Sequence, residues 1–237
     1  MNPYQKLMAR KRKWTPVKPT AGICKAGAEE AIHRALALRH MEVPVGDFIS
    51  NALTTEIPEL AREVLGSNVK DEENHDLALG YIANAYGVDQ KAEQEALRLK
   101  AAWEAHPDHT ITKALVAERA IFFVLLPFFR FNGDAGMRTV SADISRDEQI
   151  HVAVNSLAHT ELGYNISPSL DKLRKATINW VMQPLGQHTD KYLDKKFWLD
   201  SSDRLMYEGK APELAETKAA RMPAFFEHSN VNLPQYA

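Results

Sequence analysis

The stretch Ser145-Arg146-Asp147-Glu148-Gln149-Ile150-His151 places a glutamate and a histidine three residues apart. In an α-helix, positions i and i+3 lie on the same face, about one turn apart. A carboxylate oxygen and an imidazole nitrogen would then point in the same direction, which suits a transition-metal ion. The chain holds a second such motif at Glu72-Glu73-Asn74-His75. Two Glu-x-x-His helices, with one carboxylate from each of two further helices, form the pattern of a dinuclear metal site in a helical bundle.

The composition is that of an ordinary globular protein. The chain has 237 residues, of which 45% are hydrophobic and 25% charged, and its formal net charge is −2. This length suits a single domain with a sizeable core. The balanced charge gives no reason to expect nucleic acid or an anionic membrane as a partner. Because Cys24 is the only cysteine, no intrachain disulfide can form, and we expect a cytoplasmic, reducing location.

The sequence predicts an all-α protein, since no segment alternates like a strand. Residues 1–20, rich in Pro, Lys and Arg, are expected to form an extended, solvated arm before a helical domain over 21–222 and a tail over 223–237. Val43-Pro44-Val45-Gly46 should interrupt or kink the chain, and Gly66-Ser67 is a possible break. From helix propensity and cap residues we expect helices at 26–41, 60–86, 89–105, 110–130, 136–162, 168–182, 189–198 and 212–222.

A further metal ligand is expected at Glu118, at the start of the apolar run that continues to Phe129. A carboxylate in so apolar a helix is costly unless it is paired or bound to a metal. The alternative is that Glu118 marks the solvated start of its helix beside Arg119.

The first carboxylate is chosen by spacing. Glu42 lies thirty residues before Glu72, just as Glu118 lies thirty before Glu148. Equal offsets are natural if each pair sits at one level of two antiparallel helices. We therefore choose Glu42, with Asp47 as the second candidate. Four buried carboxylates would repel one another, and two divalent cations would neutralise them. Glu and His ligands suit iron or manganese, and ligand type alone also admits zinc. The expected ligands are Glu42, Glu72, His75, Glu118, Glu148 and His151.

Three segments of the chain resemble a known family in their residues and in their order along the chain. They are Ile57-Pro58-Glu59-Leu60 followed after eleven residues by Glu72-x-x-His75, then Glu118-Arg119-Ala120-Ile121-Phe122, and finally Arg146-Asp147-Glu148-Gln149-Ile150-His151. They are similar to the small, radical-generating (β) subunit of class I ribonucleotide reductase, a member of the ferritin-like superfamily. The resemblance covers roughly residues 42–159, about half of the chain. It implies a ferritin-like bundle in which the six residues above bind two metal ions, Fe/Fe or Mn/Fe.

The resemblance also implies roles for further residues and partners. The protein would react with oxygen and, as a homodimer, supply an oxidising equivalent to a large catalytic subunit for deoxyribonucleotide synthesis. Asp147 would orient a ligating histidine, as carboxylates behind metal ligands generally do. The tail 223–237 would dock on the large subunit, with Tyr236 as an anchor or an electron relay. Trp14 and Trp103 are further candidate relays. The apolar pocket beside the metals would be formed by Leu79, Phe122, Leu126 and Ile144.

One departure from the family concerns the tyrosine that stores the radical. Its position, one turn beyond the first histidine, is occupied by Leu79, which cannot hold a radical. Tyr81 would point about 240° round the helix from His75, away from the site. The oxidising equivalent would then stay on the metals, as in the branch of the family with a manganese–iron centre, or be stored on another residue.

Three other functions remain open at the level of sequence. The same bundle could be an oxygenase or oxidase with a substrate of its own, or a metal-storage protein. It could also lack a metal, with structural Glu–His pairs, although six buried polar groups without a cation would be unfavourable.

Overall fold

The computed structural model describes residues 2–55 and 57–214, so the predicted tail and Tyr236 lie outside the described residues. The described chain is helical, without a strand, which confirms the all-α prediction. No helix within these ranges combines the length and apolarity needed to cross a bilayer. The helices are α1 (Pro3–Met8), α2 (Glu29–Ala37), α3 (Glu42–Ala52), α4 (Glu59–Tyr86), α5 (Gln90–Ala105), α6 (Thr110–Ala117), α7 (Phe123–Asn132), α8 (Ala135–Glu161), α9 (Pro168–Met182) and α10 (Lys195–Glu208), with short turns η1 (Leu38–Met41), η2 (Glu118–Phe122) and η3 (Pro212–Leu214).

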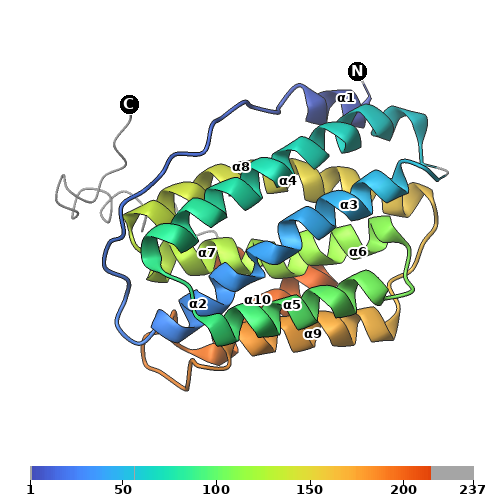
Figure 1. Cartoon of the computed structure of the whole chain (residues 1–237). Coiled ribbons are helices and arrows are strands. Elements are labelled where there is room, and N and C mark those ends of the chain that lie inside the picture. The colour runs from blue at the N-terminus through green and yellow to red at the C-terminus, as the bar shows by residue number, and fades with distance from the viewer. Residues whose placement is uncertain (1, 56, 215–237) are drawn as a thin grey trace.

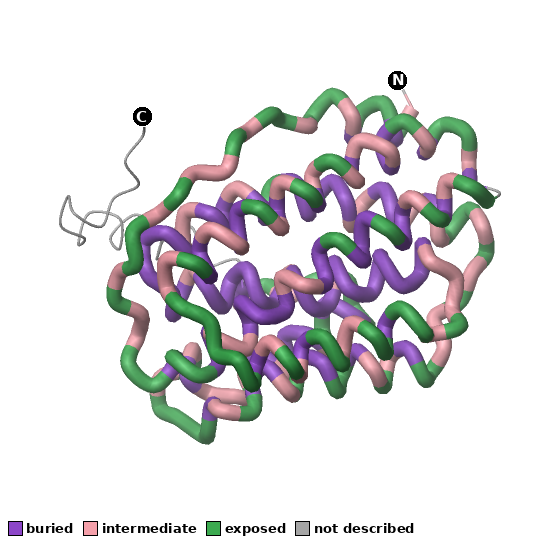
Figure 2. Tube along the Cα trace, viewed as in Figure 1, coloured by how far each residue is buried: buried purple, intermediate pink, exposed green. Residues whose placement is uncertain are grey.

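The two longest helices, α4 and α8, pack against each other and form one side of a bundle (Figure 1). Helix α3 packs on α4, and α6 and α7 pack on α8. Helices α5, α9 and α10 lie below this bundle in the same view. Figure 2 shows that buried residues gather on the helix faces that point into the molecule. The core of the bundle is therefore enclosed by α3, α4, α6, α7 and α8.

The helix ends follow local capping rules. Asp89, Asp134 and Ser167 each precede a helix, and each accepts a hydrogen bond from a backbone N–H in the first turn. Such caps satisfy donors that the helix itself cannot satisfy. Gly87 ends α4 with a φ of 97°, a conformation that favours glycine. These signals explain why the predicted boundaries of α5, α8 and α9 lie within a residue or so of the observed ones.

The sequence-based account of the region before α4 needs correction. Val43-Pro44-Val45-Gly46 does not interrupt a helix: η1 comes before it, and α3 begins at Glu42 with Pro44 in its first turn. Proline is tolerated there because its missing N–H would have no partner in the helix. A Cβ added at Gly46 would lie 3.3 Å from the Cβ of Glu72, so this glycine lets α3 approach α4 closely.

Two other boundaries were wrong. Gly66-Ser67 lies within the continuous helix α4. The helix expected at 189–198 begins later, at Lys195, because Asp194 caps it by accepting from the N–H of Lys196, and it continues to Glu208. Of the helix expected at 212–222, the turn η3 is described, and the rest lies outside the described residues.

The N-terminal segment is extended over residues 11–20, as predicted, but it is not the fully solvated arm that its composition predicted. It contains the short helix α1, whose Tyr4 and Leu7 side chains are buried. Farther along, a Cβ added at Gly136 of α8 would lie 2.7 Å from the Cβ of Pro19. The segment over residues 2–25, called the N-terminal arm below, therefore packs along α4 and α8 (Figure 1). The prediction failed because a few apolar side chains among the basic ones give the arm an inner face.

Candidate metal centre

The six expected ligands come together in the core of the bundle, and each is at most 3% exposed. They come from four elements: Glu42 from α3, Glu72 and His75 from α4, Glu118 from η2, and Glu148 and His151 from α8. The second candidate for the first carboxylate, Asp47, is exposed on α3. The structure thus favours Glu42 over Asp47.

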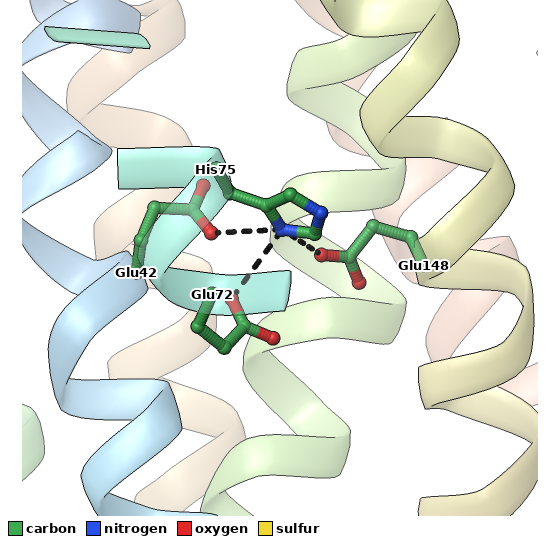
Figure 3. A group of neighbouring side chains, drawn as sticks. All are labelled: Glu42, Glu72, His75 and Glu148. Atoms are coloured by element: carbon green, nitrogen blue, oxygen red, sulfur yellow. Dashed lines mark ion pairs between the residues drawn. The ribbon is translucent and has the colours of Figure 1, made fainter. Parts of the chain in front are cut away.

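The side chains form two groups that share one member. In the first group, the carboxylates of Glu42, Glu72 and Glu148 surround His75 (Figure 3). The Nδ1 atom of His75 lies 3.7 Å from Glu42 Oε2, 3.5 Å from Glu72 Oε2 and 3.4 Å from Glu148 Oε1.

The second group consists of Glu72, Glu118 and His151. The Nδ1 atom of His151 lies 2.9 Å from Glu72 Oε1, 3.7 Å from Glu118 Oε1 and 3.8 Å from Glu148 Oε1. Within each group, the candidate ligand atoms all lie within 4.8 Å of one another. Because the two oxygens of Glu72 face different histidines, this carboxylate is placed to bridge two ions.

The oxygen and nitrogen atoms of this cluster that could bind a metal fit a pair of cations. Eight of them are buried and have no hydrogen-bond partner among the described residues. Leaving such atoms unsatisfied is costly, and carboxylates and imidazoles are acceptors that a divalent transition metal satisfies. Two divalent ions would also balance the four carboxylates. The eight atoms are Glu42 Oε2, Glu72 Oε1 and Oε2, His75 Nδ1, Glu118 Oε1, Glu148 Oε1 and Oε2, and His151 Nδ1.

Burial and neighbouring charges shift the pKa values of the cluster's residues in opposite directions. Burial raises the pKa of Glu42 and that of Glu118 well above the usual value, and the carboxylates of neighbouring glutamates raise both further. Burial alone would raise the pKa of Glu72 as well, but His151 and His75 hold it below its usual value. Burial would lower the pKa of His75, yet the surrounding carboxylates, Asp147 foremost, hold it well above normal. Without cations the cluster therefore retains protons, which metal binding would displace.

Glu118 stands in a local irregularity of its helix. The turn η2 is a π-helix between α6 and α7. Single π turns within α-helices often occur at functional sites. The second oxygen of Glu118 accepts a short hydrogen bond from the side-chain amide of Asn155, four residues beyond His151 on α8. Sequence reasoning missed Asn155, although its spacing from His151 places it on the same helix face.

Behind each histidine lies an aspartate that contacts the outer ring nitrogen. The Nε2 atom of His75 lies 3.4 Å from Asp147 Oδ2, and the indole N–H of Trp14 donates to the same oxygen over 2.6 Å. Asp147 thus lies where the resemblance placed it. Trp103, the other candidate relay, instead donates to Thr177 Oγ1 over 3.0 Å and belongs to no metal group.

The second aspartate was not predicted. His151 Nε2 lies 2.9 Å from Asp71 Oδ2, and Lys11 Nζ lies 2.5 Å from that same oxygen. The sequence does carry a signal for it, because Asp71 precedes Glu72 just as Asp147 precedes Glu148. Carboxylates in this position fix the tautomer and orientation of a ligating histidine.

A small apolar pocket adjoins Glu42. Leu79, Phe122 and Leu126 line it, as expected, and its volume is about 10 Å³. Ile144 is fully buried but is not part of this lining. Tyr81 faces the N-terminal arm, where Lys18 Nζ lies 5.3 Å from its ring centroid. The residue of α4 that borders the pocket is therefore Leu79, and Tyr81 points elsewhere.

Comparisons with protein-family models, with curated proteins and with solved structures find no match for this chain.

Proposed function

We propose that this chain is the radical-generating small subunit of a class I ribonucleotide reductase and holds an Fe/Fe or Mn/Fe pair. The observation that carries the proposal is the buried cluster of four carboxylates and two histidines, in which eight ligand atoms have no hydrogen-bond partner in the described part of the chain. Its six residues are the ones that the resemblance assigns as ligands. When bound, the metal pair would supply electrons to dioxygen and retain the oxidising equivalent.

The residues of the chain have distinct tasks in this proposal. Glu72, the member of both groups, would hold both ions, and Glu42, Glu118 and Glu148 would supply further carboxylate oxygens that balance their charge. Asp147 and Asp71 keep His75 and His151 oriented with Nδ1 toward the ions. The apolar wall formed by Leu79, Phe122 and Leu126 keeps water from the oxidised centre.

The size of the pocket bears on the type of reaction. Its volume of about 10 Å³ suits one water-sized molecule. Pockets for organic substrates measure roughly 300–1,000 Å³. The space beside Glu42 therefore suits dioxygen better than an organic substrate. This favours a protein that passes on an oxidising equivalent over an oxygenase that oxidises a substrate beside its metals.

The oxidising equivalent needs a route out of the core. Trp14, Asp147 and His75 form a continuous line of contacts from the cluster to the N-terminal arm. The Trp14 and His75 rings lie nearly parallel with centroids 6.2 Å apart. In our proposal electrons enter the centre along this line. With Leu79 in place of a tyrosine, this position of α4 offers no residue that could store the oxidising equivalent, so the metals would have to retain it for the large subunit of the reductase.

The proposal is tested by nucleoside diphosphate reduction. The metal-free protein is loaded with iron alone, with manganese alone or with both, exposed to oxygen, and mixed with the large subunit from the same source. We expect turnover with one of these loadings and none with Glu148→Ala. The matched control is Glu73→Ala, which removes an exposed carboxylate next to Glu72 and should retain turnover.

The outcomes separate the candidate functions. If no loading gives turnover although two ions bind per chain, the reductase proposal falls. An oxygenase with its own substrate, or a metal-storage protein, would then be the better assignment for the same centre.

A further inference from the structure

The outer ring nitrogens (Nε2) of the two histidines of the centre have different surroundings. Each contacts an aspartate, and each aspartate contacts a residue of the N-terminal arm. Behind His75 the arm residue is Trp14, a neutral indole. Behind His151 it is Lys11, a cation. The arm therefore completes both halves of the centre, but it does so with side chains of different charge.

The ion pair between Lys11 and Asp71 is not an ordinary surface pair. The side chain of Lys11 is 9% exposed and that of Asp71 14%. Lys11 Nζ also donates to Asn68 Oδ1, one turn earlier on α4, over 2.7 Å. An exposed pair would contribute little, whereas a largely buried pair with additional hydrogen bonds is costly to break.

Helix α1 fixes the position of Lys11. The backbone N–H of Lys11 bonds to the carbonyl oxygen of Met8 at the end of α1, over 3.1 Å. Tyr4 and Leu7 anchor that helix in the core. Lys11 thus reaches Asp71 only while the arm is docked on α4 and α8.

One oxygen of Asp71 serves both contacts. Oδ2 lies 2.9 Å from His151 Nε2 and 2.5 Å from Lys11 Nζ. A carboxylate orients an imidazole only if it is itself held in place. Without Lys11, Asp71 loses its cation and can turn toward solvent, and His151 then loses the partner that directs Nδ1 into the cluster.

We propose that Lys11 is a positioning residue for the second metal ion, acting through Asp71 on His151, so that this half of the centre forms fully only with the arm docked. The inference rests on the dinuclear centre of the proposed function but not on reductase activity. Because coupling is reciprocal, an ion bound in the His151 half also stabilises the docked arm.

The test is an anaerobic titration of the full-length, metal-free protein with ferrous iron, followed by calorimetry and native mass spectrometry. We expect two ions per chain in the wild type. Lys11→Met should weaken one binding step about tenfold, since partners behind metal ligands typically contribute 10–100-fold in affinity. The other step should stay within about twofold. Lys11→Arg should restore most of the loss, and Lys13→Met, which removes an exposed lysine of the same arm, should change neither step.

A double-mutant cycle shows whether Lys11 acts through Asp71. Asp71→Asn should weaken the same binding step, and Lys11→Met should add little in the Asp71→Asn background, because the two residues act in series. Trp14→Phe should weaken the other step instead. Lys11→Gln serves as a second neutral variant if Lys11→Met does not fold.

Three other results of the iron titration would each overturn the inference. If Lys11→Met leaves both steps unchanged, or is fully additive with Asp71→Asn, the inference is wrong while the metal centre stands. If both steps weaken alike and the metal-free melting temperature falls with them, the arm is only structural. If the wild type binds no iron, the metal centre of the proposed function falls, and the inference with it.

Discussion

Two buried charged clusters in this protein differ in how their polar atoms are satisfied. In the first, Arg174 of α9 is fully buried, and its guanidinium donates to Asp171 Oδ1, Ser202 Oγ and Asp203 Oδ1 over 2.6–2.8 Å. In the second, the Glu/His cluster between α3, α4, η2 and α8, eight ligand atoms form no hydrogen bond with the residues that the structure describes, although His151 Nδ1 lies 2.9 Å from Glu72 Oε1. The Arg174 cluster is complete within the protein, whereas the Glu/His cluster has an excess of acceptors that cations would satisfy.

The largest effect is expected from the residue shared by both metal groups. Glu72→Gln should reduce bound metal from two ions per chain to fewer than one, because Glu72 belongs to both metal groups and its two oxygens face different histidines. Glu73→Gln, on the exposed face of the same helix, should keep both ions. Elemental analysis after desalting measures the content. Equal metal content in both variants would refute the bridging role of Glu72.

Metal removal should affect the protein next most strongly. Binding to the folded state alone stabilises it by about 4 kcal/mol at a free metal concentration of a thousand times Kd. A chelator should therefore lower the urea midpoint of the wild type but not that of Glu72→Gln. If the urea midpoint of the wild type is the same with and without the chelator, the Glu/His cluster holds no ion.

Arg174→Met should destabilise the protein by about 3 kcal/mol, near the low end for breaking a buried ion pair, because Asp203 is half exposed. The loss should be the same with and without metal, since Arg174 lies outside both metal groups. Urea unfolding in the two conditions measures it. A loss seen only in the metal-bound protein would show that the two clusters are coupled.

The smallest effect is a pH dependence of the Arg174 cluster. Burial would raise the pKa of Asp171, but Tyr207 and Arg174 hold it below its ordinary value of 3.8. A lowered pKa in the folded state adds stability above pH 3.8, and this contribution is lost as the pH falls through the folded value. Urea unfolding followed from pH 6 down to below the folded pKa of Asp171 should therefore show a steeper acid loss in the wild type than in Asp171→Asn, beginning near pH 3.8. Parallel curves would contradict this assignment.

The local part of the site could be predicted from sequence. A Glu-x-x-His pair lies on one helix face by geometry alone, so Glu72 with His75, and Glu148 with His151, follow from knowing that the segments are helical. The equal thirty-residue offsets then favoured Glu42 over Asp47, and the structure buries Glu42 and exposes Asp47.

The long-range contacts of the site could not be predicted from the sequence. The contact of Lys11 with Asp71 joins the arm to α4, and that of His151 with Asp71 joins residues 80 apart in the chain. Such contacts depend on tertiary packing that no local pattern encodes. The π turn at Glu118 was missed for a similar reason, because its hydrogen-bond register depends on how α6 and α7 pack. The many basic residues of the arm predict a solvated segment, and the isolated Tyr4 and Leu7 form no pattern that would predict their burial.

The most direct test of the central claim, that the Glu/His cluster holds two metal ions, is anomalous diffraction from crystals loaded with iron and manganese. We expect two anomalous peaks within the bundle, one near His75 and one near His151, with Glu72 contacting both. Crystals of Glu72→Gln should lose at least one peak. A wild-type map with no peak in the cluster, although its side chains are ordered, would show that the cluster holds no metal pair.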